Sequence, residues 1–333
     1  MRSLQSNIIK LYLIKIAKWF MLFMPIIVLF YQDNGLEMQD IFTLKAVYSI
    51  AIVLLEIPSG YLADVLGRKK TLIIGAFLGF FGFVIYDFSF GFWGFLIAEL
   101  TLGLGQSLIS GADSALLYDS LKELGKRDKY LRYEGKMVAV GNFAEAIAGI
   151  LGGLLAEISL RSPFYAQTVV AFIAIPAALT LIEPVRYQKL SRMRFIDIIG
   201  IVKYSLFRSG HLKWNIVYSA VIGTCTLTMA WFVQPYFKVV GLSLALFGLF
   251  WSLLNLSVGI FSYYAHKIEY KFGQVKTLLF ITTMIPLIYI MLSQFQALWA
   301  IGFLFLFYFV RGIATPVLKD YINRLTDSNI RAT

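Results

Sequence analysis

The sequence predicts an all-α integral membrane protein built from two helical bundles, and three observations lead to that prediction. Hydrophobic residues make up 59% of the 333-residue chain and charged residues only 15%, too few for a soluble globule with an ordinary charged surface. The apolar residues fall into runs of roughly 18 to 24, the length at which an α-helix crosses a bilayer. Lys and Arg gather in alternate connections between these runs, as the positive-inside rule expects.

The apolar runs between polar breaks predict ten membrane helices. A β-barrel would instead show alternating segments of about ten residues. No small-residue cleavage site follows the basic N-terminus and its apolar run, so we interpret that run as a retained first helix. The helices are expected near residues 11–31, 41–62, 71–88, 92–119, 135–158, 163–182, 214–235, 242–265, 277–293 and 297–318.

The positions of the cations predict the topology. The alternate connections hold little positive charge beyond Arg161 and Lys238. The sequence therefore predicts a protein of the bacterial inner (plasma) membrane with both termini at the cytoplasmic face. The net charge of +11 then indicates contact with membrane lipids and not with nucleic acid. The cation-rich segments are the N-terminus and residues 68–70, 122–136, 186–213, 267–276 and 319–331.

A change in composition predicts the domain organisation. Residues 184–213 interleave Lys and Arg with Ile, Phe and Val, a pattern typical of a basic amphipathic segment that lies on an anionic cytoplasmic leaflet. A solvated linker is the alternative. On either side we expect an N-terminal bundle of six helices over residues 1–183 and a C-terminal bundle of four over residues 214–333.

A short charged connector follows the second predicted helix. It reads Gly60-Tyr-Leu-Ala-Asp64-Val-Leu-Gly67-Arg68-Lys69-Lys-Thr-Leu72. It resembles the signature loop between helices 2 and 3 of the major facilitator superfamily, whose pattern is roughly G-x-L-A-D-x-x-G-R-K/R-x-x-L. The resemblance implies two pseudo-symmetric helical bundles, and a transporter without cofactor or metal rather than an enzyme.

The resemblance also implies roles for single residues of the connector. Asp64 is expected to latch against the positive N-terminal end of helix 11 in the outward-facing state. Arg68 is expected to hold Asp64 or the neighbouring helix end, and Lys69 to meet headgroups. Gly60 and Gly67 are expected to permit close packing and a tight turn. The family often carries a cation where this chain has Val, and a basic loop that only sets topology is the alternative.

The two halves repeat. The segment Gly67–Leu72 matches Gly273–Leu278, and Gly111–Leu124 matches Gly312–Leu325 at a similar offset. Parallel repeats of six helices relate the halves of this superfamily. The second repeat stops after four helices, so helices 11 and 12 of the family plan are expected to be missing, in a naturally short product, a broken gene or a fragment.

The fourth predicted helix carries the strongest polar signal inside the membrane. Glu99, Gln106, Asp113 and Ser120 recur every seven residues and so share one face. An ionised carboxylate facing lipid would cost several kcal/mol, so this stripe is expected to face a cavity or another helix. Asp113 is our preferred proton or cation site, with a structural aspartate as the alternative. Gln106 and Glu99 are further candidates for proton coupling or substrate binding, and Glu99 has an ordinary role if it lies near the outer interface.

Three further polar residues are candidates for solute or proton binding. Asn142 and Glu145 lie on the fifth helix, and Glu145 is a second protonatable group near its middle. The glycines of this helix resemble a motif of drug–proton antiporters, without its usual proline. Arg311 is the one deep cation of the second half, expected to pair with a carboxylate of the fourth or fifth helix, hold an anionic solute, or reach the cytoplasmic side.

These observations favour secondary active transport. The sequence has no phosphate-cradling loop, metal-ligand cluster or nucleophile–base pair, so ATP-driven transport and membrane enzymes lose support. We expect a monomer that moves a small solute by alternating access, with protons as the second partner, in drug or cation/proton efflux. Proton-coupled uptake of an organic anion or nutrient is one alternative, and a truncated non-transporting membrane protein is another.

Overall fold

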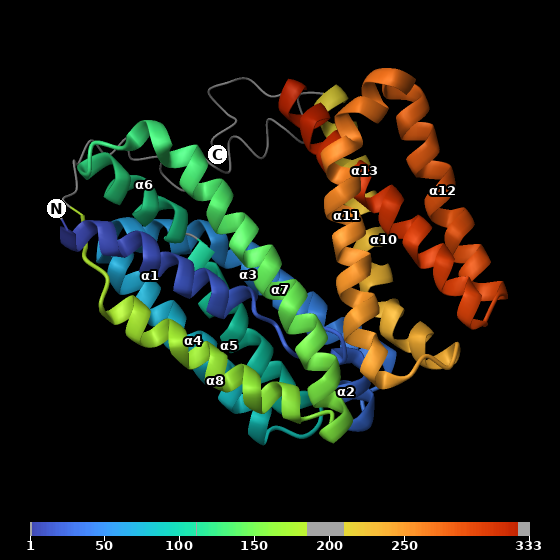
Figure 1. Cartoon of the computed structure of the whole chain (residues 1–333), viewed down its shortest axis with the longest axis horizontal. Helices are drawn as coiled ribbons and strands as arrows, with labels where there is room; N and C mark the ends of the chain where they lie inside the picture. Colours follow the sequence, from blue (N-terminus) through green and yellow to red (C-terminus); the bar gives the residue numbers. More distant parts are fainter. Residues whose placement is uncertain (1, 111, 185–209, 326–333) are drawn as a thin grey trace. The chain divides into compact units, whose positions relative to one another are not determined.

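The computed structural model describes residues 2–110, 112–184 and 210–325, and every regular element within these ranges is a helix (Figure 1). The contacts divide the chain into two compact units. The first is Met1–Gln188 with Leu244–Leu249, and the second is Lys189–Ser243 with Phe250–Thr333. Each unit is described by itself.

The first unit holds the helices that position the polar stripe. Helix α4 lies between α5 and α8, α3 packs on α5, and α1 packs on α7 and α8 (Figure 1). A 3₁₀ turn, Arg127–Lys129, precedes α7. The helices are α1 Arg2–Trp19, α2 Ile27–Asp33, α3 Met38–Leu66, α4 Arg68–Phe88, α5 Phe92–Ser110, α6 Asp113–Glu123, α7 Tyr130–Ile158 and α8 Ser162–Leu179.

The second unit contains three long helices and most of a fourth, α11, whose first residues Leu244–Leu249 belong to the first unit. Helix α13 packs against α10 and α12, and the Ser262 hydroxyl donates to the Gly312 carbonyl at 2.8 Å, which joins α11 to α13. A Cβ at Gly312 would lie 2.9 Å from the Val258 carbonyl oxygen, so the glycine permits this close approach. The helices are α10 Gly210–Val239, α11 Leu244–Phe272, α12 Gln274–Gln294 and α13 Ile301–Leu325, the last preceded by the 3₁₀ turn Leu298–Ala300.

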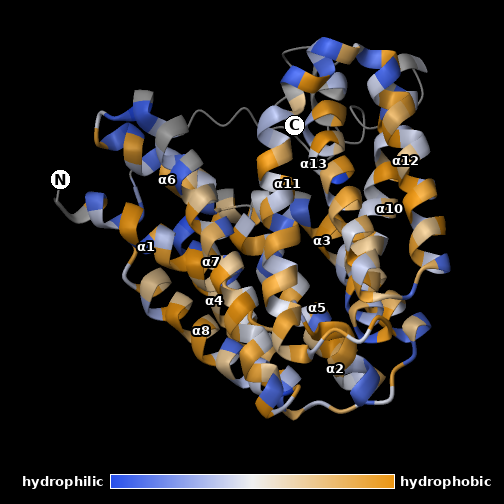
Figure 2. Ribbon diagram, turned by 45° about the vertical axis from the view of Figure 1, so that its right-hand side comes forward, coloured by the Kyte–Doolittle hydropathy of each residue, from blue (hydrophilic) through white to orange (hydrophobic). Residues whose placement is uncertain are grey.

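Nine helices in the described part of the chain are long and apolar enough to cross a membrane. Hydrophobic residues dominate their shafts and hydrophilic residues gather at helix ends and connections (Figure 2). Large apolar side chains such as Val53, Ile147 and Val169 are exposed, which a soluble protein would avoid but lipid solvates. The spans are Met38–Glu56, Arg68–Phe88, Phe92–Glu123, Ala139–Ile158, Ser162–Leu179, Lys213–Val239, Leu244–Ala265, Gln274–Gln294 and Leu298–Leu318.

The first predicted helix, 11–31, is wrong as a single element. Helix α1 ends at Trp19, α2 begins at Ile27, and residues 20–26 form turns that include Pro25, which has no N–H to donate. The Leu22 N–H donates instead to the Gln167 side chain of α8 at 2.9 Å. A Cβ at Gly152 of α7 would lie 1.8 Å from the Leu22 carbonyl oxygen. Non-helical backbone of this kind is tolerated in membrane proteins where protein buries it.

The fourth predicted helix, 92–119, is also interrupted. Helix α5 ends at Ser110, Ala112 lies in a turn, and Asp113 begins α6, so Asp113 lies at a helix end and not inside a continuous helix. The remaining predicted spans agree with α3, α4, α7, α8 and α10 to α13, several of which extend further. Most of the predicted linker, residues 185–209, lies outside the described residues, so the domain boundaries stay a prediction.

Candidate functional site

The polar stripe of α5 and α6 faces the first two helices. Residue numbers rise along α1 and α2 as those of their partners fall, so the segments run antiparallel. Gln106 is half-buried, and by this register it falls opposite the interruption at residues 20–26. The contacts are Asn7 Nδ2 to Ser120 Oγ at 3.1 Å, Lys15 Nζ to Asp113 Oδ2 at 3.8 Å and Tyr31 Oη to Glu99 Oε1 at 2.7 Å.

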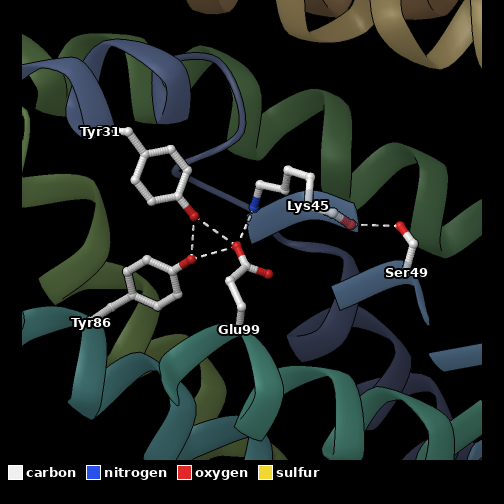
Figure 3. Close-up of polar contacts among 5 residues, drawn as sticks. All are labelled: Tyr31, Lys45, Ser49, Tyr86 and Glu99. Atoms are coloured by element: carbon white, nitrogen blue, oxygen red, sulfur yellow. Dashed lines mark hydrogen bonds and ion pairs between the residues drawn. The ribbon is translucent and has the colours of Figure 1, made fainter. Parts of the chain in front are cut away.

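Glu99 is held in a buried polar cluster (Figure 3). Its Oε1 accepts hydrogen bonds from the hydroxyls of Tyr31 at 2.7 Å and Tyr86 at 2.5 Å. The same oxygen forms an ion pair with Lys45. Only 2% of Glu99 is exposed. The carboxylate is thus buried and ion-paired, and its place near the outer interface stays a prediction. Lys45, Tyr31 and Tyr86 come from α3, α2 and α4, which sequence spacing alone did not connect.

Arg161 closes the same end of the bundle. Its guanidinium donates to the carbonyls of Tyr86, Asp87 and Ser89 at 3.0–3.1 Å and to Asn34 Oδ1 at 2.8 Å. These carbonyls end α4, and a cation is favourable at a helix C-terminus. The isolated cation of the α7–α8 connection is thus a helix cap.

Asp113 has a looser environment than Glu99. It is 6% exposed, and the 3.8 Å separation from Lys15 Nζ is longer than a charge-assisted hydrogen bond. The Ser114 N–H donates to Asp113 Oδ1 at 2.7 Å, and the Ser114 hydroxyl donates to Glu134 Oε1 of α7 at 2.8 Å. Sequence reasoning missed Glu134 because it lies in the cation-rich stretch 122–136, which looked like a connection.

The signature connector is organised by a residue that the motif does not contain. Glu183, after α8, accepts from the backbone N–H groups of Arg68 at 2.9 Å and Lys69 at 2.7 Å, the first residues of α4. A carboxylate is favourable at a helix N-terminus. Gly67 has a φ of 107° and lies against Glu183, so a side chain there would be strained.

Arg68 contacts α6, and its two predicted roles stay predictions. Its guanidinium pairs with the Asp119 carboxylate and donates to the Ala115 carbonyl at 2.5 Å, both on α6. No described atom lies within 4 Å of a Cβ built at Gly60, and the close packing predicted there stays a prediction. The side chain of Asp64 is outside what the structure describes, so its latch to helix 11 stays a prediction.

The remaining predicted residues are Asn142, Glu145 and Arg311. Asn142 is exposed on α7, and Glu145 is half-buried there. The Arg311 guanidinium lies 5.4 Å from the centre of the Tyr308 ring on its own helix, α13. Its pairing with a carboxylate of the first bundle stays a prediction, as do the transport roles of all three residues.

The family follows from a comparison with known proteins. The family model described as Major Facilitator Superfamily matches residues 12–333. The chain belongs to this superfamily. The predicted family and the all-α membrane fold are thereby confirmed. Members of the superfamily are membrane transporters of small molecules and not enzymes.

Similar proteins include quinolone resistance proteins. The protein NorA of Staphylococcus aureus strain MSSA476 is 22% identical over 208 residues, which is 62% of this chain and 50% of that protein. NorA of strain MRSA252 is 24% identical over 162 residues, 49% of this chain and 41% of that protein. The chain spans about half the length of the curated relatives it matches.

Solved structures of transporters share the fold. The nucleoside transporter NupG has a TM-score of 0.81 at 14% identity, covering 100% of this chain and 85% of that one. A bacterial homologue of the human lysosomal transporter Spinster, inward-facing and unoccupied, has a TM-score of 0.74 at 13% identity, covering 99% and 76%. A D-xylose–proton symporter has 0.62 at 16% identity, covering 97% and 86%.

Proposed function

We propose that this protein is a secondary active transporter that exchanges protons for a small solute by alternating access, in the direction of efflux. Membership of the superfamily supports transport, and the similarity to quinolone resistance proteins favours efflux. The observation that carries proton exchange is the buried, loosely paired carboxylate of Asp113.

The Lys15–Asp113 pair links protonation of Asp113 to the charge and side-chain contacts of the site. The two side chains are 13% and 8% exposed and join α1 to α6. Removing one charge of a buried pair leaves the other uncompensated, at a substantial cost in free energy. A proton on Asp113 therefore releases the Lys15 side chain and changes the net charge of the site, which shifts the balance between conformations that differ in how they bury that charge.

The Asp113 carboxylate also accounts for the exchange of a proton for the solute. A proton and a cationic solute neutralise one charge each, so both cannot bind Asp113 at once with equal advantage. Release of the solute would leave Asp113 ready to accept a proton, and release of the proton would restore the anionic site. Mutual exclusion at one buried acid is the simplest basis for antiport.

The test uses the 333-residue chain in proteoliposomes with an imposed pH gradient and the fluorescent organic cation ethidium. We expect accumulation in vesicles with an acidic interior, and its loss in Asp113→Asn. The matched control is Asp33→Asn, the same substitution at an exposed residue, and it should transport like the unaltered protein. Flux equal to that of empty vesicles, or unaffected by Asp113→Asn, would contradict the proposal.

A further inference from the structure

We propose that the Lys15 ammonium occupies a binding site for an organic cation, formed by the Asp113 carboxylate and the Trp19 ring with Glu134 as a second carboxylate. The inference rests on the proposed function and names its substrate class. Lys15 would then be a tethered competitor that the solute displaces.

The surroundings of the Lys15 ammonium are those of a bound cation. Its nitrogen lies 3.8 Å from Asp113 Oδ2 and 5.6 Å from the centre of the Trp19 ring. A carboxylate beside an aromatic face is the arrangement that recognises organic ammonium ions. The Trp19 ring is itself held in place, because it packs on Gly141 of α7, where a Cβ would lie 3.3 Å from the ring.

The weak hold on Lys15 makes displacement reasonable. A direct ammonium–carboxylate hydrogen bond measures about 2.7–2.9 Å, and the observed separation is longer. Lysine also has a long flexible stem, so its ammonium can leave the site while the backbone of α1 stays in place.

Two buried polar atoms next to this pair lack hydrogen-bond partners among the described residues. They are the Trp19 indole nitrogen, a donor, and Glu134 Oε2, an acceptor. Buried polar atoms are normally paired, so an orphaned donor and an orphaned acceptor near one ion pair point to a ligand. Ser114 connects Glu134 to Asp113 through its hydroxyl and its N–H.

The charges facing the site favour a cation. Lys15 and Lys18 of α1 lie near Asp113, and Glu134 of α7 is joined to Asp113 through Ser114. Displacement of the Lys15 ammonium leaves Asp113 without its ion-pair partner at 3.8 Å. Helix α8, which also packs on α1, has no charged residue, and the titratable neighbours include Tyr12, Tyr130 and Tyr133. A singly charged ammonium or phosphonium with an aromatic body can pair with the Asp113 carboxylate and stack against the Trp19 ring.

The experiment measures binding of tetraphenylphosphonium to the purified chain by calorimetry. This probe carries a permanent charge, so pH changes act on the protein alone. Lys15→Gln should bind it about fivefold more tightly, because the competing ammonium is removed and the ion pair that it made was weak. Lys15→Met keeps the apolar part of the lysine side chain and should bind the probe as tightly as Lys15→Gln. It replaces Lys15→Gln in the experiment if that variant does not fold. Adding Asp113→Asn or Trp19→Leu to either variant should reverse the gain.

Two controls separate the cation site from general effects. Lys10→Gln removes another lysine of α1, which donates to the Thr180 carbonyl, and should bind the probe like the unaltered protein. Tetraphenylborate has the same shape and opposite charge, so Lys15→Gln should not increase its binding. A loss of tetraphenylborate binding would identify an anion site and overturn the inference.

The outcomes distinguish this inference from the proposed function. If neither Lys15 variant binds tetraphenylphosphonium more tightly, while the unaltered protein transports in a pH gradient, the inference fails and the function stands. If binding tightens but no proton-driven flux occurs in vesicles, the cation site stands and proton-coupled transport fails.

Discussion

Glu99 and Asp113 lie on one stripe, yet their surroundings assign them different tasks. One oxygen of Glu99 accepts from Tyr31, Tyr86 and Lys45, so the charge is fully compensated. Asp113 has a lysine at 3.8 Å and a backbone N–H. A carboxylate with a close counter-ion and two hydroxyl donors gains less from a ligand or proton than a loosely paired one does. We therefore expect Glu99 to hold the fold and Asp113 to exchange partners.

Glu99→Gln should destabilise the protein and leave exchange intact. The change leaves the Lys45 ammonium, whose side chain is 12% exposed, without its counter-charge. Breaking a buried pair in this way costs about 3–5 kcal/mol. Unfolding of the purified variant by denaturant measures the loss, and Lys45→Met in the same chain should recover part of it. Unchanged stability together with abolished proton coupling would assign Glu99 to transport.

Spacing identified which residues share a face, and it could not identify their partners. The seven-residue period correctly brought out Glu99, Asp113 and Ser120 as a buried set. The choice between Asp113 and Glu99 depends on Lys15, Lys45, Tyr31 and Tyr86, which come from four other helices. Glu134 looked like part of a charged connection because the local composition around it is cationic.

At the scale of elements, the interruption of the first helix is a tertiary feature. Pro25 alone does not explain it, because α3, α8, α10, α12 and α13 each continue through an internal proline. The difference is that Gln167 accepts the freed Leu22 N–H and Gly152 lets α7 approach the Leu22 carbonyl. Apolar length therefore predicted most helices, while the exception required contacts between distant residues.

Gly152→Ala should lower the thermal unfolding midpoint of the protein. The new methyl group would lie 1.8 Å from the Leu22 carbonyl oxygen, so α7 or the interrupted segment has to move, at a cost of about 1–3 kcal/mol. The matched control is Gly79→Ala in α4, where nothing lies within 4 Å of the new Cβ and better helix propensity should leave stability equal or higher. Equal midpoints for both variants would refute the close approach.

Glu183→Ala should loosen the first turn of α4. The carboxylate accepts from the N–H groups of Arg68 and Lys69, which have no partner inside the helix. Hydrogen–deuterium exchange should speed up at these two amides, and Glu123→Ala, an exposed change on α6, should leave them unaffected. Unchanged exchange in Glu183→Ala would mean that other groups protect this turn.

At the scale of the whole molecule, the contacts of the first unit predict that it moves as one body. Asn7 bonds Ser120 and the Ile182 backbone, Arg161 ties α8 to the end of α4, and the Glu99 cluster joins α2, α3, α4 and α5. Breaking several such ties at once would cost more than one proton or solute supplies. Alternating access should therefore preserve distances inside this unit.

Spin labels on exposed positions test this directly. With Cys225 replaced by Ser, labels at Ile147→Cys and Val169→Cys report on α7 and α8 of the first unit, and a label at Leu256→Cys reports on α11. The distance between the first two should stay a single population when the pH is lowered or tetraphenylphosphonium is added. The distance from Val169→Cys to Leu256→Cys should shift under the same conditions, because only motion between units remains for alternating access. If the pair inside the first unit splits into two populations, that unit is not rigid, and the Lys15–Asp113 tie would then open by bending the bundle itself.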